Sequence, residues 1–133
     1  MNINDLVPDR EICQEAKEKG MVIESSFYWT ELNGEWFIID VLDGYSIPKG
    51  DEDRFISAPL TDEILQKLPE TINRYDRLFC LRITKTAGNY FAWYEEFETD
   101  DGIDYSLYFE DKKLSNALLL LYIKLVDEGI LKI

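Results

Sequence analysis

The chain has 133 residues, with 14 Lys and Arg against 27 Asp and Glu, and its formal net charge is −13. This length suits one ordinary domain that buries its core without disulfides or metals. The charge argues against binding to a phosphate backbone, which needs clustered cations, and favours a basic partner. We therefore expect a single domain over residues 1–133 that binds protein and no nucleic acid.

Histidine is absent from the sequence, which excludes Ser-His-Asp and Cys-His catalysis and His-based zinc sites. The two cysteines, Cys13 and Cys80, are too few for a disulfide framework, so we expect both to be reduced and buried. Glycine-rich phosphate loops and GxSxG or HExxH motifs are also missing. No catalytic, cofactor-binding or metal-binding residue is predicted.

The N-terminal sequence MNINDLVPDREICQ has no positively charged segment followed by an apolar one. It therefore does not resemble a secretory signal. The most apolar stretch of the chain is interrupted by Lys124, Asp127 and Glu128, so it does not resemble a membrane span either. A cytoplasmic location and no membrane contact are expected.

A first helix is predicted from Pro8 to Lys19, because proline suits an early helical position and Gly20 suits the stop. Met21 to Leu42 then reads as a β-hairpin around Asn33-Gly34, a pair that tolerates positive φ at both turn positions.

The two-residue turn fixes the register of this hairpin. The predicted pairs are Glu31 with Trp36, Trp29 with Ile38, Phe27 with Asp40, Tyr28 with Ile39, and Thr30 with Phe37. Both faces are largely apolar, which a sheet open to water on one side does not need. Either helices cover both faces, or Trp29 and Trp36 help to form a recognition surface.

Residues Asp43 to Leu60 form the longest stretch without a periodic pattern, and long loops in compact domains are often functional. Its acidic tip consists of Asp51, Glu52 and Asp53. This tip is either a solvated apex or a site for a metal or a partner, and the candidate partner surface runs from Asp43 to Phe55.

Thr61 is expected to cap a short helix from Asp62 to Leu68, which Pro69 ends. Three strands follow with short connections, so they should form an antiparallel meander. The predicted strands are Leu78 to Lys85, Tyr90 to Glu98 and Asp104 to Phe109.

Alternation in the second strand places Phe91 and Trp93 on the face opposite Tyr90 and Tyr94. In the third strand, Tyr105, Leu107 and Phe109 are expected to point inward. The tyrosines Tyr90, Tyr94, Tyr105 and Tyr108 either line a small-ligand groove with Trp93 or are ordinary sheet residues.

The segment from Glu95 to Asp111 holds eight acidic residues and no Lys or Arg. Asp100, Asp101 and Asp104 form its acidic turn. This segment is either a docking face for a basic protein or a set of edge charges that prevent aggregation.

The densest apolar run lies between Asp111 and Ile130 and predicts a long helix. Asp111 should cap its start, and Gly129 should end it so that Ile130 folds back on Leu125. The stripe that should face a sheet consists of Leu114, Leu118, Leu121 and Leu125.

A second apolar arc on this helix consists of Leu119, Ile123 and Val126. It must be covered by the rest of the chain or by a second copy in a homodimer, with Leu120 on the polar side as the residue to watch. Leu119, Leu120 and Ile123 are therefore candidate interaction residues.

The order of helix, hairpin, helix, meander and helix predicts an α+β domain. We expect a single antiparallel sheet of about five strands, made of the hairpin and the three-stranded meander. The C-terminal helix should pack on this sheet, together with two shorter helices.

Three stretches, SAPLTDEILQKLPETI, LRITKTAGNYFAWYEE and LSNALLLLYIKLVDEGIL, resemble small proteins encoded by bacteriophages and integrated mobile elements of gut bacteria. The resemblance covers most of the chain after residue 55. It implies a phage-like origin and a compact α+β architecture. That group has no assigned activity, so the resemblance implies no functional residues.

The leading hypothesis is a small cytoplasmic binding or accessory protein that acts through protein contacts. The alternative is an acidic inhibitor or immunity-type protein that neutralises a basic nuclease or DNA-binding enzyme, with salt-sensitive association. An enzyme that uses carboxylates or tyrosines would need a concave pocket with convergent polar groups.

Overall fold

The computed structural model describes residues 2–43, 47, 50, 52–97 and 103–133. These residues form an α+β fold with two antiparallel sheets, not the single sheet expected. The helices are α1 (Arg10–Glu18), α2 (Thr61–Leu65) and α3 (Leu114–Asp127). The strands are β1 (Phe27–Leu32), β2 (Glu35–Asp40), β3 (Phe55–Ser57), β4 (Thr71–Arg74), β5 (Arg77–Thr86), β6 (Asn89–Glu96) and β7 (Ile103–Asp111).

The three-stranded sheet has the order β2-β1-β3. The predicted hairpin register is confirmed, with Trp29 opposite Ile38, because Asn33 and Gly34 take φ values of 55° and 83°. The expected loop after the hairpin contains β3, which pairs with the free side of β1 and places Ile56 opposite Trp29. The strand β3 therefore occupies the edge of β1, where a strand of the meander would otherwise have been able to pair.

The four-stranded sheet has the order β4-β5-β6-β7, so the predicted meander is present. The strand β4 lies in a stretch predicted to be a connection, and it joins β5 through a turn in which Tyr75 and Asp76 both take positive φ. In β7 the pairing shifts: Trp93 lies opposite Tyr108 whereas Glu95 lies opposite Ile103. This bulge changes the direction of the side chains at the start of β7.

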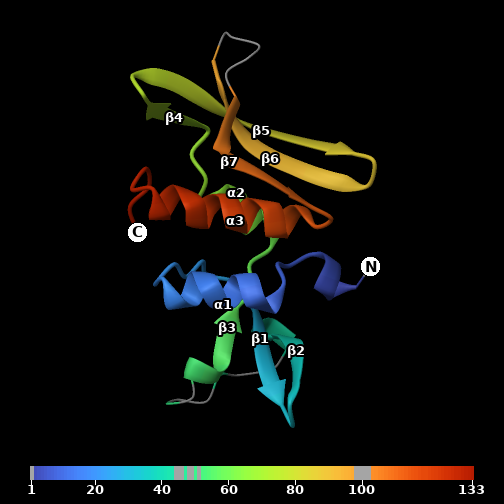
Figure 1. Ribbon diagram of the computed structural model, residues 1–133. Helices are drawn as coiled ribbons and strands as arrows, with labels where there is room; N and C mark the ends of the chain where they lie inside the picture. The colour runs from blue at the N-terminus through green and yellow to red at the C-terminus, as the bar shows by residue number, and fades with distance from the viewer. Residues whose placement is uncertain (1, 44–46, 48–49, 51, 98–102) are drawn as a thin grey trace.

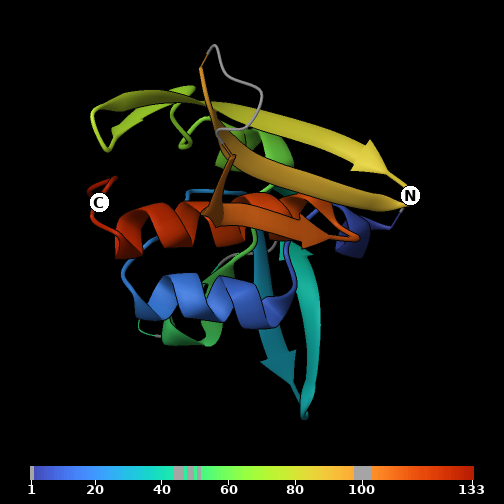
Figure 2. The same ribbon diagram turned by 45° about the horizontal axis from the view of Figure 1, so that its top comes forward.

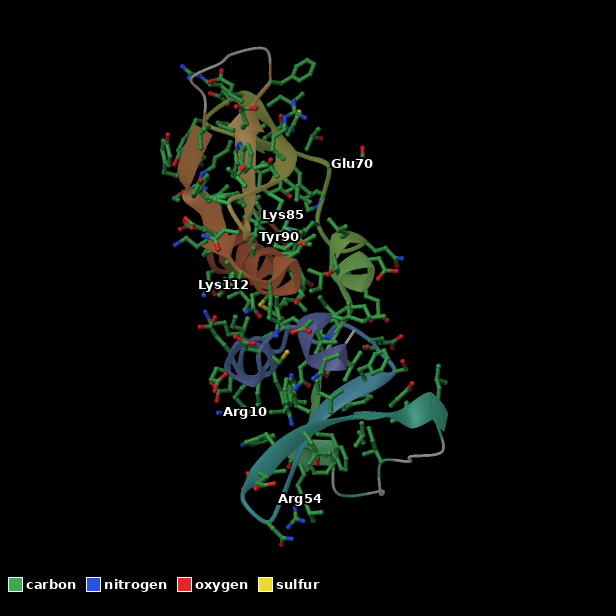
Figure 3. The ribbon with its side chains drawn as sticks, turned by 90° about the vertical axis from the view of Figure 1, so that its right-hand side faces the viewer. Arg10, Arg54, Glu70, Lys85, Tyr90 and Lys112 are labelled. Carbon is green, nitrogen blue, oxygen red and sulfur yellow. The ribbon has the colours of Figure 1, made fainter. Side chains whose placement is uncertain are left out.

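The elements stack in layers, with α3 between the four-stranded sheet and α1, and with the three-stranded sheet beyond α1 (Figures 1 and 2). The side view gives the same order from the four-stranded sheet at one end to the β1–β2 hairpin at the other (Figure 3). One hydrophobic cluster connects the layers and includes Trp29 from one sheet, Tyr94 from the other and Leu118 from α3. In the described part of the chain, no helix is long and apolar enough to cross a membrane.

The helix α3 is covered from several directions by its own chain. It contacts β6, β7, α2 and α1, and its residues Leu118, Leu121 and Leu125 are fully buried. The second arc is also in the core, since Leu119 and Ile123 are almost inaccessible. The arc was expected to be covered either by the rest of the chain or by a second copy, and here the rest of the chain covers it.

The ends of α3 were predicted with unequal success. The C-terminal end is as expected, because Gly129 has a φ of 72° and the Ile130 N–H donates to the Leu125 carbonyl at 2.9 Å. The predicted start at Asp111 was wrong, because Asp111 is the last residue of β7 and the helix begins at Leu114. The carboxylate of Asp111 instead accepts the N–H of Lys113 at 2.9 Å.

The two shorter helices are shorter than predicted. The helix α1 begins at Arg10 rather than Pro8, and α2 ends at Leu65 rather than Leu68. In α2 Thr61 is the first helical residue and not the cap. The N–H of Leu60 donates to the Glu63 carboxylate at 2.8 Å, which holds the first turn.

Candidate functional site

The four-stranded sheet has one face against α3 and one face that no helix in the described part of the chain covers. On β6, Ala92 and Tyr94 have no accessible surface, and the Tyr94 hydroxyl donates to the Pro69 carbonyl at 2.7 Å. Burial raises the pKa of this hydroxyl well above its usual range. Because side chains alternate along a strand, Phe91 and Trp93 lie on the opposite face. All three helices lie on the other side of this sheet (Figures 1 and 3).

Four aromatic rings meet on this uncovered side, and Tyr108 is at the centre of the group. The Tyr108 ring centroid is 6.0 Å from Phe91, 5.9 Å from Trp93 and 5.8 Å from Tyr105, with tilted rings in each pair. Such tilted pairs stabilise one another beyond the area they bury. We call Phe91, Trp93, Tyr105 and Tyr108 the aromatic face.

Tyr105 is the most accessible member of the aromatic face, with 73% of its surface exposed. The prediction that Tyr105 points inward was wrong. The bulge in β7 lets Leu107 point into the core while Tyr105 turns outward and packs on Tyr108. The predicted inward position of Leu107 is confirmed.

Polar side chains flank the aromatic face on two sides. Arg82 pairs in register with Trp93, and its Nε lies 3.4 Å from Oε2 of Glu95. On the other side, the Asn89 amide donates to Oε2 of Glu110 at 2.7 Å. Aromatic faces attract cations, and nearby carboxylates strengthen that attraction. The arrangement can therefore bind lysine or arginine side chains.

Trp93 also carries an unused hydrogen-bond donor. Its indole nitrogen is shielded from solvent and has no acceptor among the described residues. A buried donor without a partner costs about 1–3 kcal/mol. Trp93 therefore carries a stability cost at this position. Residues with such a cost are common at binding sites.

Three apolar candidates from the sequence lie in the core and not on a surface: Trp29, Leu119 and Ile123. The Trp29 indole N–H donates to the Pro8 carbonyl at 3.0 Å. Trp36 is half-buried beneath the Arg10 guanidinium, 4.7 Å from the ring centroid. Through these contacts, α1 and the residue Pro8 before it cover part of the hairpin face that carries both tryptophans.

Leu120 is half-buried on α3 and lies outside the core cluster. Its neighbours Leu119 and Ile123 are buried by the rest of the chain, so Leu120 is not part of an exposed apolar stripe.

The acidic candidates do not gather in one place. Asp51, Asp100 and Asp101 lie outside the described residues. Glu52 and Asp53 belong to a short 3-10 helix, Glu52–Arg54, in which the Asp53 carbonyl accepts a hydrogen bond from Lys17 at 2.9 Å.

Asp104 is engaged inside the fold. Its Oδ2 lies 3.2 Å from Nη1 of Arg74, and its Oδ1 accepts the Ser106 hydroxyl at 2.6 Å. The Arg74 contact is ionic without hydrogen-bond geometry. The same guanidinium lies 3.8 Å from the Glu128 carboxylate, so Asp104 helps to join β7 to β4 and the end of α3.

A polar network joins the start of α1 to the start of α3. Lys113 Nζ donates to the Asp9 carboxylate at 2.7 Å, and the buried Asn116 amide bonds to Asp9 and to Asp111. Burial raises the pKa of Asp9, but the hydrogen bonds from Lys113 and Asn116 outweigh it, so the pKa is lowered. Every polar atom of the Asn116 amide has a partner, which is typical of a structural link.

Among the described residues, no group of three or more Asp, Glu or Cys side chains is placed to hold a metal ion. Comparison with protein-family models, curated proteins and solved structures finds no match to this chain.

Proposed function

We propose that the protein is a small acidic binding protein that captures a basic protein partner, and that the aromatic face is its contact surface. The observation that carries this proposal is the cluster of four rings on a sheet face that no helix covers. Solvated faces of antiparallel sheets are usually polar. Here Tyr105 is exposed and the other three rings are half-buried. Apolar side chains gathered on an accessible face mark interaction sites in soluble proteins.

The charges around the rings support a lysine- or arginine-bearing partner. A cation within about 6 Å of an aromatic centroid gains about 0.5–2 kcal/mol. Glu95 and Glu110 lie beside the rings, and the whole chain carries a net charge of −13. Long-range attraction then steers a basic partner to the molecule, while the rings supply the close contacts.

An inhibitor that neutralises a basic nuclease or DNA-binding enzyme is a special case of this function. The carboxylates of Glu95 and Glu110 flank the rings and would meet cations that otherwise contact phosphate. In that case the captured partner would be an enzyme, and its nucleic-acid-dependent activity would fall as the complex forms. A captured partner with no such activity would leave the general binding function in place.

Site-specific photo-crosslinking tests the proposed surface. Thr84 is exposed on β5 and pairs in register with Phe91, so benzoylphenylalanine at this position lies beside the aromatic face. Gln66, exposed after α2, is the control position. We expect adducts with basic proteins from position 84 and not from position 66. Equal labelling from both positions would contradict the proposal.

Substitutions on the aromatic face should remove these adducts without unfolding the protein. Tyr105→Ser removes an exposed ring. Leu42→Ser is the matched control, because Leu42 is an exposed apolar residue that follows β2 of the three-stranded sheet. Trp93→Phe removes the donor without an acceptor, so stability should hold while binding weakens.

Salt distinguishes the electrostatic part of the proposal. If the partner is basic, complex formation should weaken as ionic strength rises. Adducts that persist in Tyr105→Ser would refute the proposed surface. Adducts that are unchanged between low and high salt would refute the proposed charge of the partner.

A further inference from the structure

A concave feature lies between α1, β1, β3 and α3, at the end of the molecule away from the four-stranded sheet. It is a pocket of about 220 Å³. Its lining includes Cys13 and Ala16 of α1, Leu119 of α3, and the residues Met21, Tyr28 and Phe55. Figure 1 shows α1 between α3 and β3, and all three of these elements contribute residues to the lining.

The size and lining of the pocket limit what it can hold. A helix or strand of another protein needs a long groove, and this pocket is closed on several sides by separate elements. Apolar cavities of about 150 Å³ stay dry and bind molecules such as benzene. The pocket therefore suits a small molecule and not a polypeptide segment.

Two polar side chains at the pocket, those of Ser57 and Lys17, are already engaged with the backbone. The Ser57 hydroxyl donates to the Ile23 carbonyl. Lys17 Nζ donates to the carbonyls of Asp53 at 2.9 Å and Phe55 at 3.1 Å. Burial raises the pKa of the Cys13 thiol to about 12, so near neutral pH it is not a nucleophile. A bound molecule would be held without a covalent bond.

We propose that this pocket binds an uncharged aromatic molecule of one or two rings. The thioether of Met21 and the rings of Tyr28 and Phe55 make favourable contacts with an aromatic ligand. An ionised ligand would have to leave water for a mostly apolar lining, which is costly. This site is separate from the aromatic face and does not depend on the function proposed for it.

Titration with indole, followed by amide chemical shifts of the whole protein, tests the site. We expect saturable shifts at Met21, Ile23 and Leu119, and at least about tenfold weaker binding of indole-3-carboxylate, because its charge must be desolvated. Absence of shifts at these amides would overturn the proposal. Tighter binding of the carboxylate than of indole would overturn the assigned ligand class.

Two tryptophan substitutions with equal starting exposure supply the variant and its control. Val22 lines the pocket and Leu32 lies at the end of β1, and each is 62% exposed, so both variants should fold. In Val22→Trp the new indole competes for the pocket, and we expect indole affinity to fall by about tenfold or more. Leu32→Trp should bind indole as the parent does. If Val22→Trp binds indole with the same affinity as the parent, indole binds elsewhere and the proposed site is refuted.

Discussion

Replacing Asn116 by alanine should destabilise the protein more than any other single polar substitution in the network that joins α1 to α3. The Asn116 side chain is 2% exposed. Its Oδ1 accepts the Asp9 N–H at 2.7 Å, and its Nδ2 donates to the carboxylates of Asp9 and Asp111, each at 3.0 Å. Asn116→Ala removes all three hydrogen bonds and leaves the Asp9 N–H without its acceptor.

The magnitude follows from the partners that remain. An orphaned, partly buried N–H costs about 1–3 kcal/mol, and hydrogen bonds to charged groups contribute about 1.5–3 kcal/mol each. Asp9 and Asp111 both keep hydrogen bonds from Lys113, and Asp9 is partly solvated, so the lower values apply. We expect a loss of about 4 kcal/mol in the free energy of unfolding, or roughly 15 °C in Tm for a chain of this size.

Urea unfolding of the parent and of Asn116→Ala at neutral pH measures this loss. Asn89→Ala is the control, because it removes an exposed hydrogen bond to Glu110 and should change stability by less than about 0.5 kcal/mol. A loss below about 1 kcal/mol for Asn116→Ala would refute the reasoning, since it would mean that water replaces the amide without cost.

The same comparison has a defined pH dependence. The pKa of Asp9 is lowered from its ordinary value of 3.8 in the folded protein, so its ionised form contributes stability above that value. This contribution is lost as the pH falls through the lower folded pKa. The stability difference between the parent and Asn116→Ala should therefore be constant near neutral pH and shrink below about pH 4.

Three further outcomes are expected. Gly129→Ala should cost about 1 kcal/mol by chemical denaturation, because Gly129 has a φ of 72° while a Cβ would meet no neighbour. In the folded protein, Cys80 should react with a thiol reagent well before Cys13, which is buried with a raised pKa; equal rates would contradict this. Leu118→Ala should lower the free energy of unfolding by about 3–5 kcal/mol and the half-buried Leu120→Ala by less than half as much.

Turn chemistry explains which strands the sequence could predict. Asn33 and Gly34 are the usual residues for a turn with two positive φ values, so the register of the first hairpin followed directly. Tyr75 and Asp76 adopt the same kind of turn without the usual residues. The short strand β4 before them was therefore read as a connection.

The division into two sheets depends on contacts between segments distant in the sequence. The three residues of β3 are too few to show a periodic pattern, yet they pair with β1 and close its free edge. The apolar circumference of α3 did indicate cover from two directions. It could not indicate that one cover would be the four-stranded sheet and another α1.

The aromatic face was only partly visible in the sequence. Alternation correctly placed Phe91 and Trp93 on one side of β6, but both sides of that strand are apolar. Only the position of α3 decides which side is uncovered. The bulge that turns Tyr105 outward leaves no sequence signal as clear as a glycine or proline.

The position of α3 in the chain also sets the order in which the protein can complete its fold during synthesis. All seven strands of the described residues precede α3, and the core that it completes includes side chains from both sheets. The four-stranded sheet therefore leaves the ribosome before the helix that shields it. We expect the strands of this sheet to depend on the arrival of α3 to avoid association with other chains.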